Sequence, residues 1–320
     1  MARNSSDQIV SIILAAGKGS RMNTPHLHKV CFQIDGKPVI AKAIDTYAAA
    51  GIDTHYIVVG EVLGQVVQAA SLASGNIAFC HQSHQLGTGH ATKCATKNLE
   101  VLGFDGGILV VAGDKVIEEA AIIKLVEVFK ETNCDLAMLV GDTGDSPSAG
   151  RIICDGDGKT LGIIESFDVA KIQFLNILKR LTLDSNISSA EAESLAIAYL
   201  RSEKKASLAL GRLWDIIKSG REISSDDILQ NFSESDFILK ISDVNIPLDS
   251  LSKPGYANTS VYLFKSHALY SSLKMIQSSN AQNEEYLTDT ISILAKQGAD
   301  IKLVPIDYPE QVMAFNTPEE

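Results

Sequence analysis

The stretch Ile9-Val10-Ser11-Ile12-Ile13-Leu14-Ala15-Ala16-Gly17-Lys18-Gly19-Ser20-Arg21-Met22 decides the fold of this chain of 320 residues. Its first half is almost wholly apolar, which predicts a buried strand over Ile9–Ala15. Its second half is a loop in which glycines let backbone N–H groups approach phosphate oxygens, and Lys18 and Arg21 add cations. The loop matches neither a Walker A sequence nor a dinucleotide fingerprint, because Met22 occupies the third glycine position of G-x-G-x-x-G. The pattern favours phosphate binding over a plain tight turn.

Short apolar runs alternate with helical segments through the first 165 residues. Strands without polar alternation, separated by helices, are typical of a parallel sheet that is covered on both faces. Further strands are predicted at His55–Val59, Ile77–Cys80, Ile108–Ala112 and Leu136–Val140, and helices at Val39–Ala50, Val62–Leu72, His90–Leu99 and Ala120–Lys130. The predicted fold class is α/β, with a doubly wound, mostly parallel sheet.

The composition changes between residues 168 and 254, where the β signal is weak and helical patterns dominate. Amphipathic helices are predicted at Lys171–Leu181 and Ser207–Lys218. Ser188-Ser189-Ala190-Glu191 resembles a capping box that begins another helix, and Ser224-Ser225-Asp226-Asp227 begins a further one. The β signal then returns at Ser260–Phe264, before a helix near Tyr286–Lys296 and a strand at Ile301–Val304. We therefore divide the chain into residues 1–167, a helical insertion at 168–254, and the remainder of the first domain at 255–320.

Composition and charge exclude several classes of protein. The 39 acidic residues outnumber the 28 basic ones, and a net charge of −11 does not suit a nucleic-acid partner. No apolar run approaches the ~18 residues of a membrane span. Five dispersed cysteines without a C-x-x-C pair indicate neither disulfides nor zinc, so we expect a cytoplasmic protein. The start of the chain also resembles a short signal peptide, but Asp7 and Ser11 interrupt that pattern and make export the weaker alternative.

Nine short segments, in the same order along the chain, resemble the sugar-1-phosphate nucleotidyltransferase family, and within it the UDP-N-acetylglucosamine pyrophosphorylases. The segments are Leu14–Met22, His28–Val30, Gln82–His90, Val111–Asp114, Ala149–Ile152, Gly162–Glu165, Ala257–Thr259, Asn283–Asp289 and Phe315–Asn316. Together they cover about residues 8–167 and 255–320. The resemblance implies a Rossmann-like nucleotidyltransferase fold, with residues 1–167 as its nucleotide-binding half and 255–320 as its sugar-binding remainder.

The implied reaction makes a UDP-sugar and pyrophosphate from UTP and a sugar-1-phosphate, with N-acetylglucosamine-1-phosphate as the expected sugar. A sugar phosphate oxygen attacks the α-phosphorus in line, with the assistance of Mg²⁺. Because such a transfer needs mainly positioning and charge neutralisation, the catalytic residues are expected to be cations. The resemblance assigns these roles to Lys18, Arg21 and Lys29.

The same resemblance names the residues that would hold UTP. They are Leu14, Ala15, Ala16, Gly17, Lys18, Gln82, Gly87 and Thr88. Gln82 would recognise uracil, because an amide offers both a donor and an acceptor to an imide edge. Gly87 would let the backbone approach the base, with Thr88 beside it. His81, His84 and His90 have no acidic ligand near them in the sequence, so we expect solvated or helix-start histidines rather than a metal site.

The expected sugar-binding residues are Gly150, Glu165 and Asn258, and the expected ligands of Mg²⁺ are Asp114 and Asn316. Asp114 ends an apolar strand, and ligands of open α/β sheets bind at that edge. Mg²⁺ prefers oxygen donors, usually one or two from the protein together with phosphates and water.

Three positions depart from the family pattern. His28 replaces a proline, Ala112 replaces a tyrosine beside the sugar site, and Lys115-Val116 replaces a segment in which the second residue is usually proline. A different nucleotide and sugar-1-phosphate pair therefore stays open. A second alternative is a non-catalytic regulatory protein that binds a nucleotide sugar and docks partners through the insertion.

We expect the insertion to act as a lid, or as a surface for a protein partner or a second copy of the chain. A decoration on the far edge of the sheet is the alternative. No hexapeptide repeats are present, so acetyl transfer is not predicted. Thr317-Pro318-Glu319-Glu320 has the pattern of a helix start, so we expect the chain to be part of a longer protein.

Overall fold

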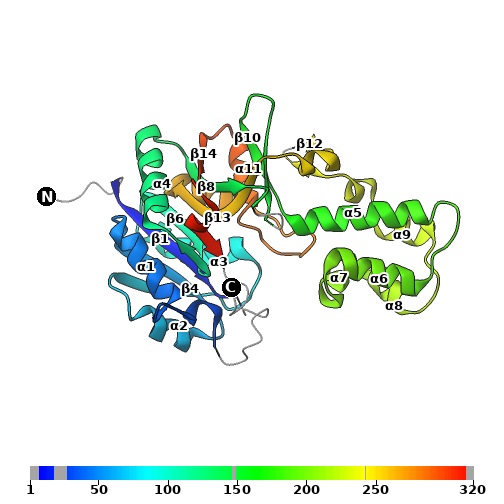
Figure 1. Cartoon of the computed structure of the whole chain (residues 1–320), viewed down its shortest axis with the longest axis horizontal. Coiled ribbons are helices and arrows are strands. Elements are labelled where there is room, and N and C mark those ends of the chain that lie inside the picture. Colours follow the sequence, from blue (N-terminus) through cyan, green and yellow to red (C-terminus); the bar gives the residue numbers. More distant parts are fainter. Residues whose placement is uncertain (1–6, 18–26, 146–148, 242, 315–320) are drawn as a thin grey trace.

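The computed structural model describes residues 7–17, 27–145, 149–241 and 243–314 (Figure 1). Four parallel strands form one half of its central sheet, in the spatial order β6 (Gly107–Ala112), β1 (Ile9–Ala15), β4 (Thr54–Val59) and β5 (Asn76–His81). Ile12 and Ile13 of β1 are both fully buried although they point to opposite faces, because helices cover the sheet on both sides. The predicted α/β fold class is confirmed.

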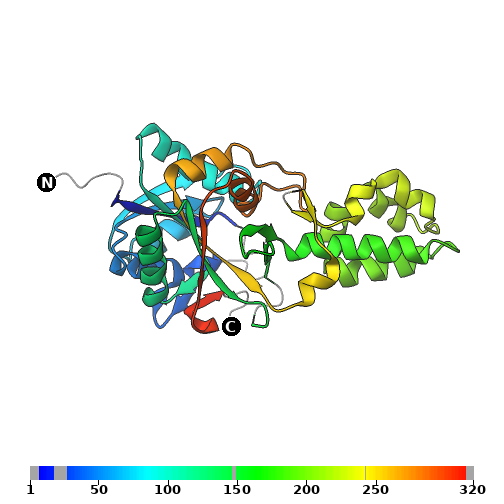
Figure 2. The same cartoon turned by 90° about the horizontal axis from the view of Figure 1, so that it is seen from above.

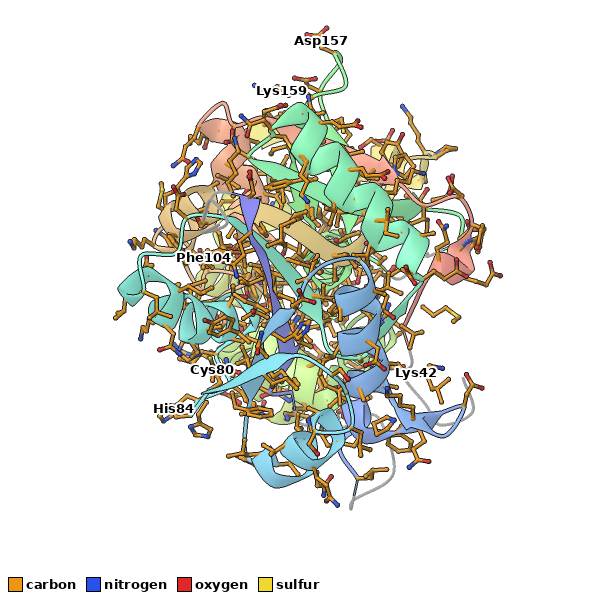
Figure 3. The ribbon with its side chains drawn as sticks, turned by 90° about the vertical axis from the view of Figure 1, so that its left-hand side faces the viewer. Lys42, Cys80, His84, Phe104, Asp157 and Lys159 are labelled. Carbon is orange, nitrogen blue, oxygen red and sulfur yellow. The ribbon has the colours of Figure 1, made fainter. Side chains whose placement is uncertain are left out.

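The other half of the sheet is mixed. Its strands are β8 (Leu136–Asp142), β9 (Arg151–Cys154), β10 (Thr160–Ile164), β13 (Tyr256–Lys265) and β14 (Ile301–Pro305). β13 runs antiparallel to both β6 and β8, and β14 pairs in parallel with β8. β9 and β10 form an antiparallel hairpin, whose turn around Asp157 projects from the molecule in Figure 3. Strand β13 therefore places the residues that follow the insertion in the same sheet as the strands of the first half of the chain.

Two hydrophobic clusters lie on the two faces of the sheet. One cluster includes Ile13 and residues of α1 (Val39–Ala49), α2 (Leu63–Ala70) and α4 (Glu119–Thr132). The other includes Ile12 and residues of α3 (Thr88–Val101), α10 (Ser266–Leu273) and α11 (Asp289–Lys296). No helix in the described part of the chain is long and apolar enough to cross a membrane.

The insertion projects to one side of the sheet as a separate group of helices (Figures 1 and 2). Its helices are α5 (Ser166–Leu181), α6 (Ser189–Leu200), α7 (Glu203–Leu210), α8 (Arg212–Lys218) and α9 (Ser225–Asn231). They pack around a hydrophobic cluster of their own that includes Phe174, Leu178 and Trp214. The chain returns to β13 through two short strands, β11 (Lys240–Ile241) and β12 (Val244–Asn245).

Several predicted boundaries differ from the structure. The single helix predicted at Ser207–Lys218 is wrong: α7 ends and α8 begins at Gly211, whose positive φ of 51° is unfavourable for other residues. α5 begins five residues before the predicted Lys171, and α11 begins three residues after the predicted Tyr286. Ser188 accepts a hydrogen bond from the Glu191 backbone as an N-cap, but the reciprocal bond of a capping box forms only at the other predicted start.

Candidate active site

A cavity of about 370 Å³ opens at the carboxyl ends of the parallel strands. Ligands of open α/β sheets bind at this edge. The cavity brings together seven of the predicted nucleotide-binding residues, namely Leu14, Ala15, Ala16, Gly17, Gln82, Gly87 and Thr88. Lys29 and Asp114 line the same cavity. The other two predicted cations, Lys18 and Arg21, lie outside the described residues.

Lys29 and Asp114 form an ion pair across the cavity. Lys29 begins a short 3-10 turn (Lys29–Cys31), and Asp114 follows the end of β6. The Lys29 Nζ donates a hydrogen bond to the Asp114 Oδ2 over 2.6 Å. Both side chains are largely buried, with 14% and 29% of their surfaces exposed. A cation and a carboxylate are thus held together in the wall of the cavity.

His28 supports the loop that follows β1. Its Nε2 lies 2.8 Å from the Gly17 carbonyl oxygen, and its backbone N–H donates to the Gln65 side-chain oxygen of α2 over 2.8 Å. Burial lowers the pKa of His28, so the ring is neutral near pH 7 and its Nε2–H donates to Gly17. The sequence marked His28 only as a departure from proline, and the contact partners are distant in the chain, so this role was missed.

Gln82 is one of the polar residues that line the cavity. Its side chain is buried, and its Nε2 donates to the Gly87 carbonyl oxygen over 3.2 Å and lies 3.0 Å from Nδ1 of His90. No described residue donates a hydrogen bond to its side-chain oxygen, which is left as an acceptor. His90 lies in the first turn of α3 and is half-buried, because its ring contacts the Gln82 side chain. His81 and His84 are exposed as expected, and Figure 3 shows His84 at the edge of the molecule.

The segment of residues 280–288 packs against the Leu86–Gly89 region and contributes Glu284 to the lining of the cavity. The Glu285 backbone N–H donates to the Leu86 carbonyl oxygen, and the Glu285 carbonyl oxygen accepts from the Gly89 N–H, each over 2.7 Å. A Cβ at Gly87 would lie only 2.5 Å from the Glu285 carbonyl oxygen. Glycine is therefore required at position 87 by the protein's own backbone, which is a different reason from the predicted approach of a base.

This segment is also held by side chains. Thr88 Oγ1 accepts a hydrogen bond from the Leu287 N–H over 3.0 Å, and Lys93 forms an ion pair with Glu285 over 2.8 Å. Glu284 lines this cavity and also the neighbouring one. Residues 283–289 are part of the family resemblance, but no role in the site was predicted for them.

A second cavity, of about 720 Å³, adjoins the first and contains Gly150, Glu165 and Asn258. The Gly150 carbonyl oxygen accepts from the Asn258 N–H over 2.9 Å, so two of the three predicted sugar ligands touch. Glu165 Oε1 accepts from Thr288 Oγ1 over 2.8 Å, and burial raises the pKa of Glu165. Asn258 Oδ1 accepts from the Tyr262 hydroxyl over 2.8 Å, which leaves the amide nitrogen for a ligand.

The residues present suit Mg²⁺ in part. Asp114 is a largely buried carboxylate that lines both cavities, and Mg²⁺ sites need only one or two protein carboxylates when phosphates complete the coordination. Asn316, the other predicted ligand, lies outside the described residues. β15 (Val312–Ala314) pairs with β7 (Lys115–Ile117) and places Ala314 opposite Lys115, directly after Asp114. Elsewhere in the described chain, no cluster of three or more His, Cys, Asp or Glu side chains is arranged to hold a metal.

Sequence comparison identifies the family to which a chain with this fold and these two adjoining cavities belongs. Residues 11–205 match the MobA-like NTP transferase domain, and the chain belongs to this family. The resemblance to sugar-1-phosphate nucleotidyltransferases is confirmed by its curated relatives, which are named bifunctional protein GlmU.

The protein from Clostridium tetani is 27% identical over 96% of this chain and 49% of its own length. The protein from Geotalea uraniireducens is 30% identical over 68% of this chain and 46% of its own length. The chain thus spans about half the length of these curated relatives. A solved structure from Bacillus anthracis, assigned provisionally as a glucose-1-phosphate thymidylyltransferase, has a TM-score of 0.58 at 16% identity. It covers 97% of this chain and 91% of that one, and supports the fold alone.

Proposed function

We propose that this chain transfers a uridylyl group from UTP to a sugar-1-phosphate, with N-acetylglucosamine-1-phosphate as the first candidate, and releases pyrophosphate. One observation carries this proposal. We assign the first cavity to the nucleotide (the nucleotide cavity) and the second to the sugar phosphate (the sugar cavity). The two cavities share Leu14, Thr88, Ala112, Asp114 and Glu284, so they meet where Asp114 pairs with Lys29. A nucleotide in one cavity and a sugar phosphate in the other would place their phosphates side by side at this charged pair.

The chemistry requires little beyond this arrangement. An oxygen of the sugar phosphate forms a bond to the α-phosphorus of UTP, while the bond from that phosphorus to the β-phosphate oxygen breaks and pyrophosphate leaves. Lys29 would neutralise charge at the reacting phosphates, and Lys18 and Arg21 remain the predicted ligands of the leaving pyrophosphate. Asp114 would hold Mg²⁺ together with Asn316, and the bound ion would supply positive charge to the phosphate oxygens.

The preference for UTP rests on Gln82. Because its amide nitrogen is engaged by Gly87 and His90, its side-chain oxygen is free to accept a hydrogen bond. Uracil offers the N3–H donor that this oxygen needs, and cytosine has none at that ring position. Thymine carries the same N3–H, so dTTP is the second candidate nucleotide.

A pyrophosphate-release assay with Mg²⁺ tests the proposal. UTP, dTTP, CTP, GTP and ATP are each combined with glucose-1-phosphate, N-acetylglucosamine-1-phosphate and other hexose-1-phosphates. We expect release that depends on both UTP and a sugar-1-phosphate. Binding of UTP without release from any pair would favour the regulatory alternative. A cytoplasmic location and the lack of nucleic-acid or membrane partners stay predictions from composition.

A further inference from the structure

The insertion contributes two cations to the sugar cavity. Arg201 directly follows α6 and Lys205 lies in the first turn of α7, and both line the cavity that holds Gly150, Glu165 and Asn258. Of the clustered helices α6, α7 and α8, α7 lies nearest to the sheet in Figure 1. The α6–α7 corner is therefore part of the wall of the site rather than a distant surface.

Local structure fixes both positions. The Arg201 N–H donates to the Ile197 carbonyl oxygen over 2.8 Å and ends α6, and Ser202 caps α7 by accepting from the Lys205 N–H over 3.3 Å. The Lys205 Nζ lies 5.1 Å from the centre of the Phe167 ring, two residues after Glu165. Arg201 forms no ion pair with a carboxylate in the described parts of the chain. Its guanidinium is therefore available to a ligand.

The two cations lie away from the reacting phosphates. Asp114 lines both cavities, whereas Arg201 and Lys205 line only the second one. Phe167 and Lys205 are on the Glu165 side. A sugar whose 1-phosphate lies at Asp114 would direct its opposite end toward Arg201 and Lys205.

Most of the other charged residues of this cavity are acidic. Asp114, Asp142, Asp145, Glu165 and Glu284 line it, and the further cation among its described lining residues is Lys115, directly after Asp114. A neutral sugar would need no cation at the far end, because its hydroxyl groups can bond to carboxylate and amide groups. An anionic substituent, in contrast, would be repelled by this wall unless placed cations received it. Burial raises the pKa values of Glu165 and Glu284, which weakens the opposing charge.

We propose that Arg201 and Lys205 bind a second anionic group of the sugar phosphate, either a carboxylate or a phosphate, at the end opposite its 1-phosphate. The substrate is then an acidic sugar-1-phosphate, and the insertion determines this specificity. This inference rests on the proposed function, since it assigns the substrate class of the same site. It makes N-acetylglucosamine-1-phosphate a poorer substrate than an acidic sugar phosphate.

The test compares acidic and neutral substrates in the full chain. Pyrophosphate release is measured with glucose-1-phosphate, N-acetylglucosamine-1-phosphate, glucuronic acid-1-phosphate and glucose-1,6-bisphosphate, and the two acidic compounds distinguish a carboxylate from a phosphate. The variants are R201A, K205A and the double variant, and K204A is the matched control, because Lys204 is an exposed neighbour that does not line the cavity. Thermal melting confirms that each variant is folded.

Loss of the charge-assisted contacts should reduce kcat/KM for the preferred acidic substrate by about 10- to 100-fold in the double variant. The neutral sugars should change by less than about twofold, and K204A should have no effect. An equal loss for acidic and neutral sugars would overturn the inference, because the cations would then serve the 1-phosphate or the fold. Unchanged kinetics in the double variant would overturn it as well.

Calorimetric binding of the same sugar phosphates separates this inference from the proposed function. If no pair of substrates turns over, the uridylyltransferase proposal fails, but the acidic sugar phosphates can still bind. Tighter binding of an acidic sugar phosphate, lost in the double variant, would support the site. Equal affinity of wild type and double variant for these compounds would reject it.

Discussion

Asp114 and Lys29 are 85 residues apart in sequence, yet their charges meet at the end of β6. The Asp114 carboxylate belongs to the edge of the sheet and does not take part in the hydrophobic clusters, so Asp114→Asn should leave the fold intact. We expect a loss of turnover on the order of 10²- to 10³-fold, because an amide is a poorer ligand for a hard cation and leaves Lys29 without its counter-charge.

Pyrophosphate release and thermal melting of the Asp114→Asn protein check this prediction together. A melting temperature close to that of the wild type is required, because the isosteric Asn keeps the shape of a side chain that lies outside the hydrophobic clusters. Asp145→Asn is the matched control, because that carboxylate lines only the sugar cavity. Near-normal turnover in Asp114→Asn would remove Asp114 from the site.

Gln82 and His90 form a pair in which the histidine positions the amide. Gln82→Ala should relax the choice of base, because the acceptor for an N3–H is lost, and the ratio of UTP to CTP use should fall by about tenfold or more. His90→Ala should have a smaller effect in the same direction, since Gly87 still accepts from Gln82.

Competition between UTP, dTTP and CTP in the pyrophosphate assay measures these ratios. His84→Ala is the control, because this histidine is exposed (Figure 3) and makes no contact with Gln82. A ratio that stays constant in Gln82→Ala would show that other groups select the base.

Residues of the site were predictable where the signal is local. Leu14 to Gly17 follow a buried strand and form a glycine loop, and Gln82 to Thr88 lie in one short segment. Contacts between distant segments gave no such signal. Gln85 donates from its side-chain nitrogen to the Ala16 carbonyl oxygen over 2.7 Å, and Glu284 joins the two cavities, but neither contact follows from spacing in the sequence.

The same distinction applies to whole elements. The largely apolar strands β1, β6 and β8 were predicted because burial on both faces leaves a nearly continuous apolar run. The antiparallel position of β13 between β6 and β8 was not predictable, because pairing partners are set by tertiary packing rather than by local pattern. The turn between α7 and α8 was missed because the apolar periodicity continues past Gly211.

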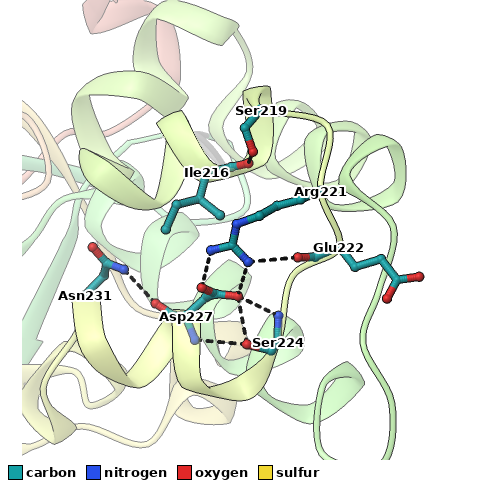
Figure 4. Close-up of polar contacts among 7 residues, drawn as sticks. All are labelled: Ile216, Ser219, Arg221, Glu222, Ser224, Asp227 and Asn231. Carbon is teal, nitrogen blue, oxygen red and sulfur yellow. Dashed lines mark hydrogen bonds and ion pairs between the residues drawn. The ribbon is translucent and has the colours of Figure 1, made fainter.

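The start of α9 shows a network that stabilises the insertion (Figure 4). Asp227 accepts hydrogen bonds from the backbone and hydroxyl of Ser224 and forms a bidentate pair with Arg221. The hydrogen bond from Arg221, followed by those from Ser224, holds the pKa of Asp227 well below its usual range. The folded state therefore favours the ionised carboxylate.

Asp227→Asn should lower the melting temperature of the insertion at pH 7. Because the pKa is lower in the folded state than in the unfolded chain, the ionised carboxylate contributes stability above about pH 4, and this contribution is lost as the pH falls further. The difference between the wild type and Asp227→Asn should thus shrink on going from pH 7 to pH 3.

Melting curves of both proteins across this pH range provide the measurement. Asp226→Asn is the matched control, because Asp226 is exposed in the same helical turn and should show a smaller, salt-sensitive effect. A constant difference between wild type and Asp227→Asn at every pH would contradict the assigned role of the charge.

At the scale of the whole molecule, one segment connects the insertion with both cavities. Asp168, in the first turn of α5, accepts a hydrogen bond from the Ala281 N–H over 2.9 Å, and Glu165 accepts from Thr288. The same 280–288 segment contacts Leu86 and Gly89 beside the nucleotide cavity. Helix α5 of the insertion is therefore linked through residues 280–288 to the Leu86–Gly89 segment beside the nucleotide cavity. The α6–α7 corner of the insertion lines the sugar cavity.

Replacing Asp168–Lys253 with a short Gly/Ser linker tests whether the insertion belongs to the active site. The insertion has its own hydrophobic cluster, so its removal should leave the two clusters on the faces of the sheet in place. We expect the trimmed protein to bind UTP with nearly unchanged affinity. Its kcat/KM for the preferred sugar-1-phosphate should fall by at least about tenfold, because the Arg201 and Lys205 wall is lost, and its discrimination between sugars should decrease.

Circular dichroism and UTP binding first establish that the trimmed protein retains its fold, and pyrophosphate release with a panel of sugar-1-phosphates follows. Asp168→Ala in the full chain is the matched control, because it breaks the contact with Ala281 while the α6–α7 corner stays present. A loss in the trimmed protein that Asp168→Ala does not reproduce assigns the effect to the wall of the cavity. If the trimmed protein keeps both its rate and its sugar preference, the insertion has no part in substrate selection, and only a role in docking a partner would remain for these helices.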